Sequence, residues 1–481
     1  MSRRAAGHWR MHQTAASMPS SLSSNNDKSS GGGTAKENGG RADGKALSQS
    51  AIQERARVTE STSALFERWT EGREVPFLGT NSGADPLAFQ AWHRFKEAFS
   101  PELIFRSINE HGGEVKRCLD QFGGSGTTAL SAQFLGIPST TVEINPFLAD
   151  VIQAKVATYN VDLLARDLGL VTKVAREPGN IEAYFGNVPK TFLEPGVGER
   201  WLFDTAVATQ LASLLAAIDQ LENPLHQRLF RVLVGGLLAE VSNVVVSGKG
   251  RRYRKNWQQT RRSASQVMRL FTLRARAAIS DVHRFARPFA EAKIMVGDAR
   301  RVQPKGQFDV AVFSPPYPNS FDYTDVYNLE LWMLGYLSAS SDNQTLRRST
   351  LSSHVQLQRK FAPAPDESRS LTNTLDLLED VRPDLWSPWI PEMVGAYFAD
   401  LLMVLERTHK ALSRGGKAWI VVGDSSYAGI AVPTAKVLKE LTDGAGWSGV
   451  TIEKLRQLSS SAQQRKVANL FESLVILTRE S

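Results

Sequence analysis

Three features of the sequence carry groups suited to binding a nucleoside, and each follows a run of residues typical of a strand. The first is the turn at residues 120–128, DQFGGSGTT, whose three glycines permit positive φ and close approach of the backbone to a ligand. The others are two acids, Glu143 in TVEINP and Asp298 in VGDAR. A carboxylate at the second strand tip can accept hydrogen bonds from ribose hydroxyls, and the third could accept from an adenine amino group. Because no lysine follows the glycines, we predict a nucleoside-bearing ligand held without apparatus for phosphates.

A fourth feature is a rigid corner at the end of an apolar run, in DVAVFSPPYPNSFDY (309–323). Proline fixes φ and lacks an amide hydrogen, so Pro315 and Pro316 end the strand in one shape. They are flanked by the hydroxyl of Ser314 and the ring of Tyr317. The corner therefore presents an oxygen and an aromatic ring at fixed positions on a strand tip.

Taken in order, DQFGGSGTT, TVEINP and VFSPPY resemble the S-adenosylmethionine-dependent amino-methyltransferases of DNA. The family's cofactor motif, D-x-F-x-G-S-G-T, is matched here, with Gln121 where the family usually has proline. HRFKEAFSPELI (93–104) is similar to the segment that flanks the methionine part of the ligand. The resemblance covers residues 90–150 and 293–480 and implies S-adenosylmethionine as cofactor. The cofactor-binding residues that it implies are Asp120, Phe122, Gly124, Ser125, Gly126, Thr127, Glu143 and Asp298.

The resemblance implies methyl transfer to an exocyclic amino group at the corner. Such an amine is a poor nucleophile because its lone pair is delocalised into the base, and accepting hydrogen bonds from its protons favours a tetrahedral nitrogen. Ser314 Oγ and the carbonyl of Pro315 are acceptors that the prolines hold in place. The ring of Tyr317 would stack on the base and stabilise the nearby sulfonium. A base inside a duplex must be flipped out to reach this corner. The predicted catalytic residues are Ser314, Pro315, Pro316 and Tyr317.

The identity of the base is indicated less strongly than the reaction. Family members with Asp or Asn at the first position mostly modify adenine, whereas Ser is usual in cytosine-N4 enzymes, so Ser314 favours cytosine-N4. Adenine-N6 methylation of DNA and methylation of an RNA base amino group are alternatives, because the same oxygens accept from any amino group. A catalytically silent binding subunit is opposed by the intact corner. The single cysteine, Cys118, lies mid-strand in KRCLDQF, where a buried apolar role is predicted rather than the nucleophile that carbon-5 methylation requires.

The elements that must position these groups are those of a parallel sheet. EVKRCLDQF, GTTALSAQFLG and STTVEIN read as strand, helix and strand, a βαβ unit, and strand signals resume after residue 290. We predict an α/β fold, a doubly wound and mostly parallel sheet of the Rossmann-like class I methyltransferase type, with a large helical insertion. The predicted organisation is a disordered tail at 1–62, the cofactor part of the methyltransferase domain at 63–154, a helical basic insertion at 155–290 and the catalytic part at 291–481.

The tail and the composition bound the location of the protein. Residues 1–62 are rich in Ser, Gly and Asn, which predicts disorder; an organellar transit peptide, suggested by Arg3, Arg4 and Arg10, is the alternative. No apolar run is long enough to cross a membrane, and one cysteine excludes a multi-cysteine zinc site. We therefore predict a cytoplasmic protein with neither a membrane partner nor a metal.

Basic residues gather in the predicted insertion. Residues 249–276 carry ten Lys or Arg and no acid, in a chain of net charge +8, with aromatic side chains interleaved. Since unrelieved positive charges repel one another without an anion, we favour contact with nucleic acid over a solvated helical face. Segments 155–290 and 338–395 are candidates for target recognition. The expected partner is duplex DNA with a flipped base, in a restriction–modification or defence setting with a cognate endonuclease or defence proteins as candidate partners. The predicted DNA-binding residues are Arg251, Arg252, Tyr253, Arg254, Lys255 and Trp257.

Overall fold

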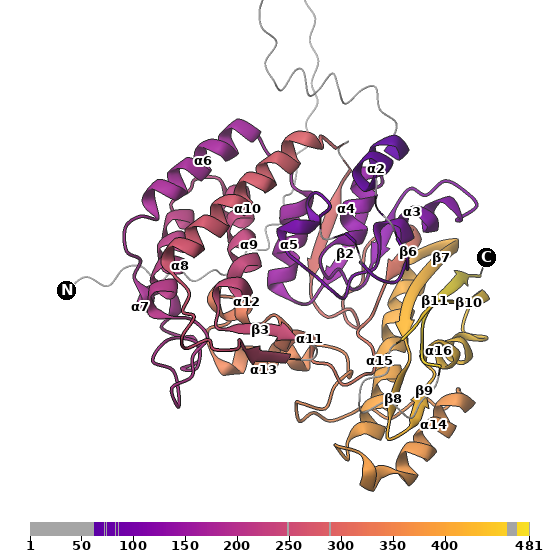
Figure 1. Cartoon of the computed structure of the whole chain (residues 1–481). Helices are drawn as coiled ribbons and strands as arrows, with labels where there is room; N and C mark the ends of the chain where they lie inside the picture. The colour runs from indigo at the N-terminus through magenta and orange to yellow at the C-terminus, as the bar shows by residue number, and fades with distance from the viewer. Residues whose placement is uncertain are drawn as a thin grey trace, which may run out of the picture. The chain divides into compact units, whose positions relative to one another are not determined.

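A seven-stranded sheet forms the centre of the structure. The structure is a computed structural model that describes residues 62–480 apart from 72, 74, 82, 85, 248–249, 288–289 and 459–468. Its strands are β1 (Cys118–Asp120), β2 (Ser139–Glu143), β5 (Ala292–Val296), β6 (Phe308–Phe313), β7 (Leu412–Gly423), β10 (Trp447–Gln457) and β11 (Phe471–Arg479). The spatial order is β10-β11-β7-β6-β1-β2-β5. Figure 1 labels β10, β11, β7, β6 and β2 of this sheet. The strands all run in one direction except β11, which pairs antiparallel with both β10 and β7. All these strands belong to the compact unit Ala51–Ser481. The predicted tail lies outside the described residues except for Thr62.

Side chains of the central strands alternate between two hydrophobic cores, one on each face of the sheet. Val310 and Val312 of β6 point into one core, whereas Ala311 and Phe313 point into the other. Because successive side chains of a strand face opposite sides, a strand buried on both faces must be apolar throughout. This explains why VAVF reads as a continuous apolar run. The predicted doubly wound, mostly parallel sheet with a large helical insertion is confirmed.

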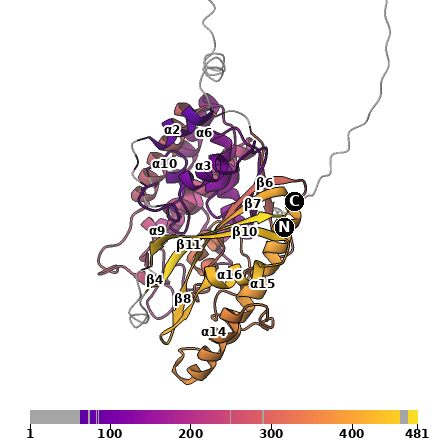
Figure 2. The ribbon, with the colours of Figure 1, turned by 90° about the vertical axis from the view of Figure 1, so that its right-hand side faces the viewer.

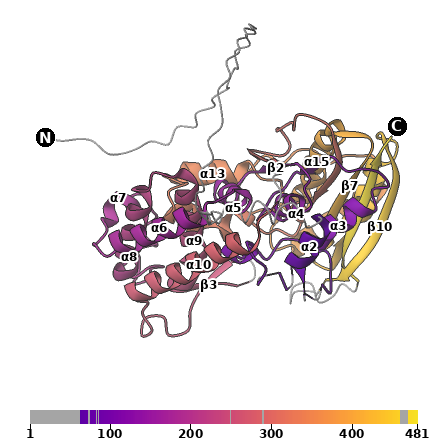
Figure 3. The ribbon, with the colours of Figure 1, turned by 90° about the horizontal axis from the view of Figure 1, so that it is seen from above.

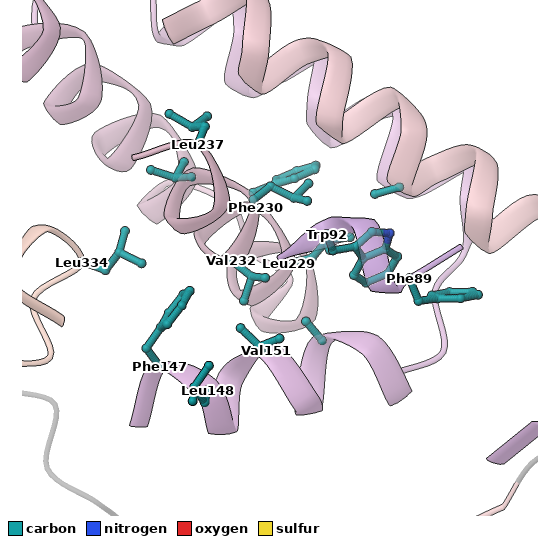
Figure 4. Packing of buried hydrophobic residues seen from close by; sticks show 14 of the residues in the cluster. Phe89, Trp92, Phe147, Leu148, Val151, Leu229, Phe230, Val232, Leu237 and Leu334 are labelled. Carbon is teal, nitrogen blue, oxygen red and sulfur yellow. The ribbon is translucent and has the colours of Figure 1, made fainter. Parts of the chain in front are cut away.

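The first core lies between the sheet and helices that include the insertion. Its helices near the sheet are α2 (Thr62–Thr70), η1 (Gln90–Trp92), α3 (Pro101–Asn109), α4 (Thr127–Phe134) and α5 (Pro146–Val156). Asn145 begins α5 by accepting hydrogen bonds from the amides of Phe147 and Leu148 at 3.0 and 3.3 Å, which is a favourable N-cap. Figure 4 shows Phe147 and Val151 of α5 facing apolar side chains of the helix at 224–241.

The insertion between β2 and β5 is mostly helical. It consists of α6 (Val161–Val174), α7 (Ile181–Phe185), α8 (Thr205–Asp219), α9 (Pro224–Val241), the hairpin β3 (Val244–Ser247) and β4 (Gly250–Tyr253), and α10 (Ala264–Arg284). In Figure 3 the helices α6 to α10 gather to one side of the sheet. The hairpin is a departure from the predicted helical segment, since it occupies the start of the basic stretch. No helix among the described residues is long and apolar enough to cross a membrane.

The second core lies on the other face of the sheet. The remaining elements are α11 (Tyr323–Val326), α12 (Asn328–Met333), α13 (Ser340–Arg348), α14 (Arg369–Asp380), η2 (Arg382–Asp384), α15 (Ile390–Ala411), the hairpin β8 (Ser425–Tyr427) and β9 (Ile430–Val432), and α16 (Thr434–Thr442). Figure 2 shows α14, α15 and α16 grouped beside β7, β10 and β11. The apolar faces of α14, α15 and α16 fill this second core.

The order of the strands reverses between β1 and β6, which pair in parallel with Cys118 opposite Val310 and Leu119 opposite Ala311. From β1 the chain proceeds outward to β2 and β5, and from β6 it proceeds to β7 on the other side. Ligands of doubly wound sheets bind at the carboxyl ends of the strands at such a switch point. The glycine turn follows β1 and the double-proline corner follows β6, so the topology brings them to the same edge.

Candidate active site

A cavity of about 390 Å³ opens at this edge, between the glycine turn and the corner. Its walls come from segments far apart in sequence. They are residues 95–99, 121–125, 142–145, 297–299, 314–317 and 349–351, together with side chains that include Tyr323, Tyr327, Arg456 and Glu472. The space between the turn and the corner is thus open rather than filled by packed side chains.

The glycine turn is shaped by its own glycines and by two buried acids. Gly124 has φ +51°, and a Cβ there would lie 3.0 Å from the ring of Phe95, so a larger residue would be strained and crowded. Asp120 lies beneath the turn and accepts a hydrogen bond from the Phe122 amide at 2.9 Å. Burial raises the pKa of Asp120 to about 7. Asp120 and Gly126 do not line the cavity, because Asp120 supports the turn from beneath and Gly126 precedes Thr127, the first residue of α4.

Glu143 ties the tip of β2 to the turn. Its carboxylate accepts hydrogen bonds from the amides of Gly124 and Asn145 at 2.7 and 2.8 Å. Burial raises the pKa of Glu143 to about 7. The side chain also lines the cavity, where a carboxylate has further lone pairs to offer to hydroxyl groups.

Asp298 lines the same cavity but is already paired. Both of its oxygens accept hydrogen bonds from Arg300, with Nε at 2.9 and 3.1 Å and Nη2 at 2.8 Å. The main-chain amide of Arg300 donates to Asp298 Oδ1 as well, at 2.9 Å. Arg300, only two residues along the chain, was not predicted as a partner of Asp298. Asp298 therefore has fewer free lone pairs for a ligand than predicted.

Two buried hydroxyls of the cofactor motif have no hydrogen-bond partner among the described residues: Ser125 Oγ and Thr127 Oγ1. Both residues line the cavity, as does Phe122, whose ring packs 5.9 Å from that of Phe313. A buried hydroxyl without a partner is costly, so a polar ligand beside the turn would satisfy these atoms. The residues of the turn fit a nucleoside-bearing cofactor on this ground.

The corner holds its hydroxyl and its ring in defined positions. Ser314 donates its hydroxyl hydrogen to the carbonyl of Val421 at 3.0 Å, which leaves oxygen lone pairs as acceptors. The ring of Tyr317 lies over Gly423, where a Cβ would come within 2.5 Å of Tyr317 Cδ2 and Cε2. Burial, followed by the charge of Glu472, raises the pKa of Tyr317 well above its ordinary value.

Glu472, at the start of β11, was missed by sequence reasoning. It is buried and accepts hydrogen bonds from Tyr317 Oη at 3.0 Å and from Arg456 at 2.8 and 3.0 Å. Glu472 lies 155 residues from Tyr317, so no local spacing reveals the pair. An acid followed by a serine at the start of an apolar strand was the only local signal.

Tyrosines that follow the corner complete the cavity wall. The Tyr327 ring stacks on Phe95 at 5.6 Å, and its hydroxyl donates to Glu97 at 3.1 Å. Burial raises the pKa of Glu97. Tyr323 also lines the cavity, whereas Asp322 caps α11 by accepting hydrogen bonds from two amides.

The predicted DNA-binding residues divide into exposed and structural groups. Arg252 and Lys255 are exposed, whereas Arg254 donates to the main-chain carbonyls of Ser242 and Ala239 at 3.1 and 2.7 Å. The rings of Tyr253 and Trp257 lie 5.0 Å apart and are half-buried. Three members of the set therefore support the fold of this region.

Arg251 connects the hairpin to the wall of the active-site cavity. Its guanidinium lies 3.6 Å from Asp325 of α11, the helix that follows the corner. The hairpin thus packs beside the segment that carries Tyr323. Within the described part of the chain no group of three or more His, Cys, Asp or Glu is arranged to hold a metal ion.

Comparisons with known proteins identify methyltransferases as relatives. The chain is 25% identical over 427 residues to the Type II methyltransferase M.BsoBI of Geobacillus stearothermophilus, covering 78% of this chain and 81% of that protein. It is 22% identical over 460 residues to the Type II methyltransferase M.AvaI of a Nostoc species, covering 87% and 92%. The Type II methyltransferase M.MjaII of Methanocaldococcus jannaschii is 30% identical over 76 residues, covering 16% and 14%. These relatives support the methyltransferase part of the resemblance.

Other comparisons add little. No protein-family model matches the chain. Among solved structures, the rRNA methyltransferase aviRa of Streptomyces viridochromogenes is 10% identical and covers 79% of this chain and 85% of its own, with a TM-score of 0.23, which is too low to support an argument. The fold assignment follows from the strand order and the two cores.

Proposed function

We propose that this protein transfers a methyl group from S-adenosylmethionine to the exocyclic amino group of a flipped base in duplex DNA, with cytosine-N4 as the preferred target. The observation that carries the proposal is the single open cavity bounded by the glycine turn and the corner. The names of the relatives, Type II methyltransferases, support methyl transfer and a restriction–modification setting. For such a setting we propose a cognate endonuclease as the partner.

The cofactor would be held by the turn and the strand tips. S-adenosylmethionine supplies, when bound, a methyl group carried on a sulfonium. Ser125 and Thr127 offer hydroxyls without other partners, and Glu143 offers a carboxylate at the strand tip. We assign Glu143 to the ribose hydroxyls, by analogy with other doubly wound sheets. Asp298 would orient the adenine end, with Arg300 fixing its carboxylate.

The corner would activate the amine of the target base. The hydroxyl of Ser314 donates to the carbonyl of Val421, so the lone pairs of its oxygen can accept a hydrogen bond from an amino N–H of the base. The carbonyl of Pro315 is the second acceptor in this proposal, fixed by the proline ring. When Ser314 and Pro315 accept hydrogen bonds from both amino hydrogens, they favour a tetrahedral nitrogen whose lone pair can attack the methyl carbon. The bound cofactor would supply the methyl group: an N–C bond would form as the S–C bond breaks to leave a neutral thioether, and the methylated amino group would then lose one proton to solvent water.

Identification of the methylated nucleoside tests this function. The protein is incubated with methyl-labelled S-adenosylmethionine and either duplex DNA or RNA, and the nucleic acid is digested to nucleosides. We expect label in N4-methylcytosine from DNA. Label in N6-methyladenine would overturn the assignment of the base, and label in RNA alone would overturn the assignment of the nucleic acid.

A further inference from the structure

A second cavity, of about 370 Å³, lies behind one wall of the candidate active site. Its lining is dominated by cationic side chains from three parts of the chain. They are Arg300 after β5, Arg348 at the end of α13, and Arg359 and Lys360 in the following segment; the other lining residues are Ser352, Gln358, Ala362 and Asp400. Neither the cofactor motif nor the basic insertion includes this cluster.

The acid in this cavity is already neutralised. Asp400 lies 2.9 Å from Arg300 Nη1 and also accepts from the Ser352 amide at 2.8 Å. Arg300 in turn pairs with Asp298 in the candidate active site. The charge of Arg300 is therefore balanced twice by carboxylates that belong to the protein.

The other three cations have no such balance. Among the described residues, Arg348, Arg359 and Lys360 form no ion pair with a carboxylate. The Nη atoms of Arg359 donate to neutral acceptors, at 3.0–3.3 Å: the main-chain carbonyls of residues 347, 350 and 351, and the ring of His354. Its Nε is buried and has no partner in the described chain. The charges of Asp400 and Asp322 act on Arg359 only from beyond ion-pair distance. A partly buried guanidinium that forms no direct ion pair is costly, so this arrangement favours an anion.

The two cavities share a wall. Ser349, Thr350 and Leu351 line the candidate active site, whereas Arg348 and Ser352 line the second cavity. Arg359 fixes the carbonyls of Thr350 and Leu351, and Arg300 donates to the carbonyl of Ser349 at 3.1 Å. An anion held by these guanidiniums would therefore stabilise the wall of the active site from behind.

We propose that the second cavity binds a phosphodiester group of the nucleic-acid strand whose base enters the active site. Guanidinium groups match phosphate oxygens in geometry, and the exposed Arg348 and Lys360 are free to close over such a group. This inference rests on the proposed function for the source of the phosphate. Neutralising one backbone phosphate here would couple strand binding to a wall of the candidate active site.

The test compares two double variants that lose the same charge. Arg348→Ala/Lys360→Ala removes the exposed cations of the cavity, and Lys436→Ala/Lys439→Ala removes two exposed lysines of α16, outside the candidate recognition segments. Affinity for a fluorescent mixed-sequence duplex is measured by anisotropy from about 50 to 200 mM salt. We expect the cavity variant to bind about tenfold more weakly than the control, with a salt slope smaller by about 1. Thermal melting checks that both variants are folded.

Inorganic phosphate distinguishes the source of the anion. If millimolar phosphate raises the melting temperature of the wild type but not of the cavity variant, while both double variants bind duplex equally, the cavity takes free anions and the strand assignment is overturned. Equal behaviour of the two variants in both assays overturns the anion site altogether. Methyl transfer by the wild type is measured in parallel: its absence counts against the proposed function, whereas equal duplex affinities count against this cavity alone.

Discussion

Tyr317 is held at both ends of its side chain. Its ring rests on the backbone at Gly423, and its hydroxyl donates to Glu472, which Arg456 binds through two hydrogen bonds. A ring positioned in this way can stack on a base without paying the full entropy of ordering an aromatic side chain at the moment of reaction. Glu472 is thus a positioning residue in the proposed mechanism.

Glu472→Ala should lower kcat by about tenfold to a hundredfold while changing the KM for the cofactor much less, because Tyr317 loses its anchor. Glu472→Gln, which keeps an acceptor for the tyrosine, should lose less. Both parameters are measured with labelled S-adenosylmethionine on DNA. If alanine and glutamine variants turn over at the wild-type rate, the anchoring role is wrong.

Gly423→Ala should impair transfer by displacing the ring of Tyr317, because the added Cβ would lie 2.5 Å from two ring atoms. Gly169→Ala in α6 is the matched control, since a Cβ there meets nothing within 4 Å. We expect at least a tenfold loss of kcat for the first variant and none for the second. Wild-type activity of Gly423→Ala would show that the ring does not need its present position.

The pKa of Glu143 predicts how stability depends on pH. Burial raises this pKa from 4.5 to about 7, so its favourable contribution is present below about pH 4.5 and is lost as the pH rises through about 7. Glu143→Gln cannot ionise. The melting temperature of the unliganded variant should therefore rise relative to the wild type between about pH 5 and pH 8. A constant difference across this range would contradict the raised pKa.

At the scale of elements, the sequence indicates the strands of the sheet better than the hairpin in the insertion. Strand β6 is apolar throughout because both of its faces are buried, which gives a readable pattern. By contrast, β3 continues the apolar run of α9, and β4 is basic and only half-buried, so no periodicity separates the hairpin from its helical neighbours. Strand β10 is largely exposed and is fixed by pairing with β11.

The same limit applies to the candidate site. The turn, Glu143 and the corner could be predicted because each follows its own strand. Glu472 and the shared wall at 349–353 could not, because only the assembled sheet brings them to the cavity. Interactions across long separations leave no local spacing to read.

The hairpin allows a prediction that separates binding from folding. Arg252→Ala/Lys255→Ala removes exposed charges and should weaken duplex binding severalfold with little change in stability. Arg254→Ala should instead destabilise the protein by about 1–3 kcal/mol, because the Ser242 carbonyl loses its arginine donor and the Ala239 carbonyl keeps only the hydroxyl of Ser242. Duplex anisotropy and urea denaturation measure the two effects. The reverse pattern would show that Arg254, not the exposed pair, contacts DNA.

For the whole molecule, the central relation is that one long segment of the chain packs beside the cavity and another lines it. Residues 155–290 leave the sheet after β2 and bring Arg251 to Asp325 beside the corner. The chain between α12 and α15 supplies the wall at 349–353. The sheet thus provides the glycine turn and the corner, and these two segments provide the surfaces proposed to hold the strand.

The claim on which this account depends is that the turn and the corner form one site for methyl transfer. The most direct test is single-turnover transfer to duplex DNA from prebound labelled S-adenosylmethionine by the wild type and by Ser314→Ala, with the cofactor Kd measured by equilibrium dialysis. We predict that the variant transfers at least about a hundredfold more slowly, because the amine loses an acceptor, and that its Kd stays within about threefold of the wild type. Transfer by Ser314→Ala at the wild-type rate would contradict the account.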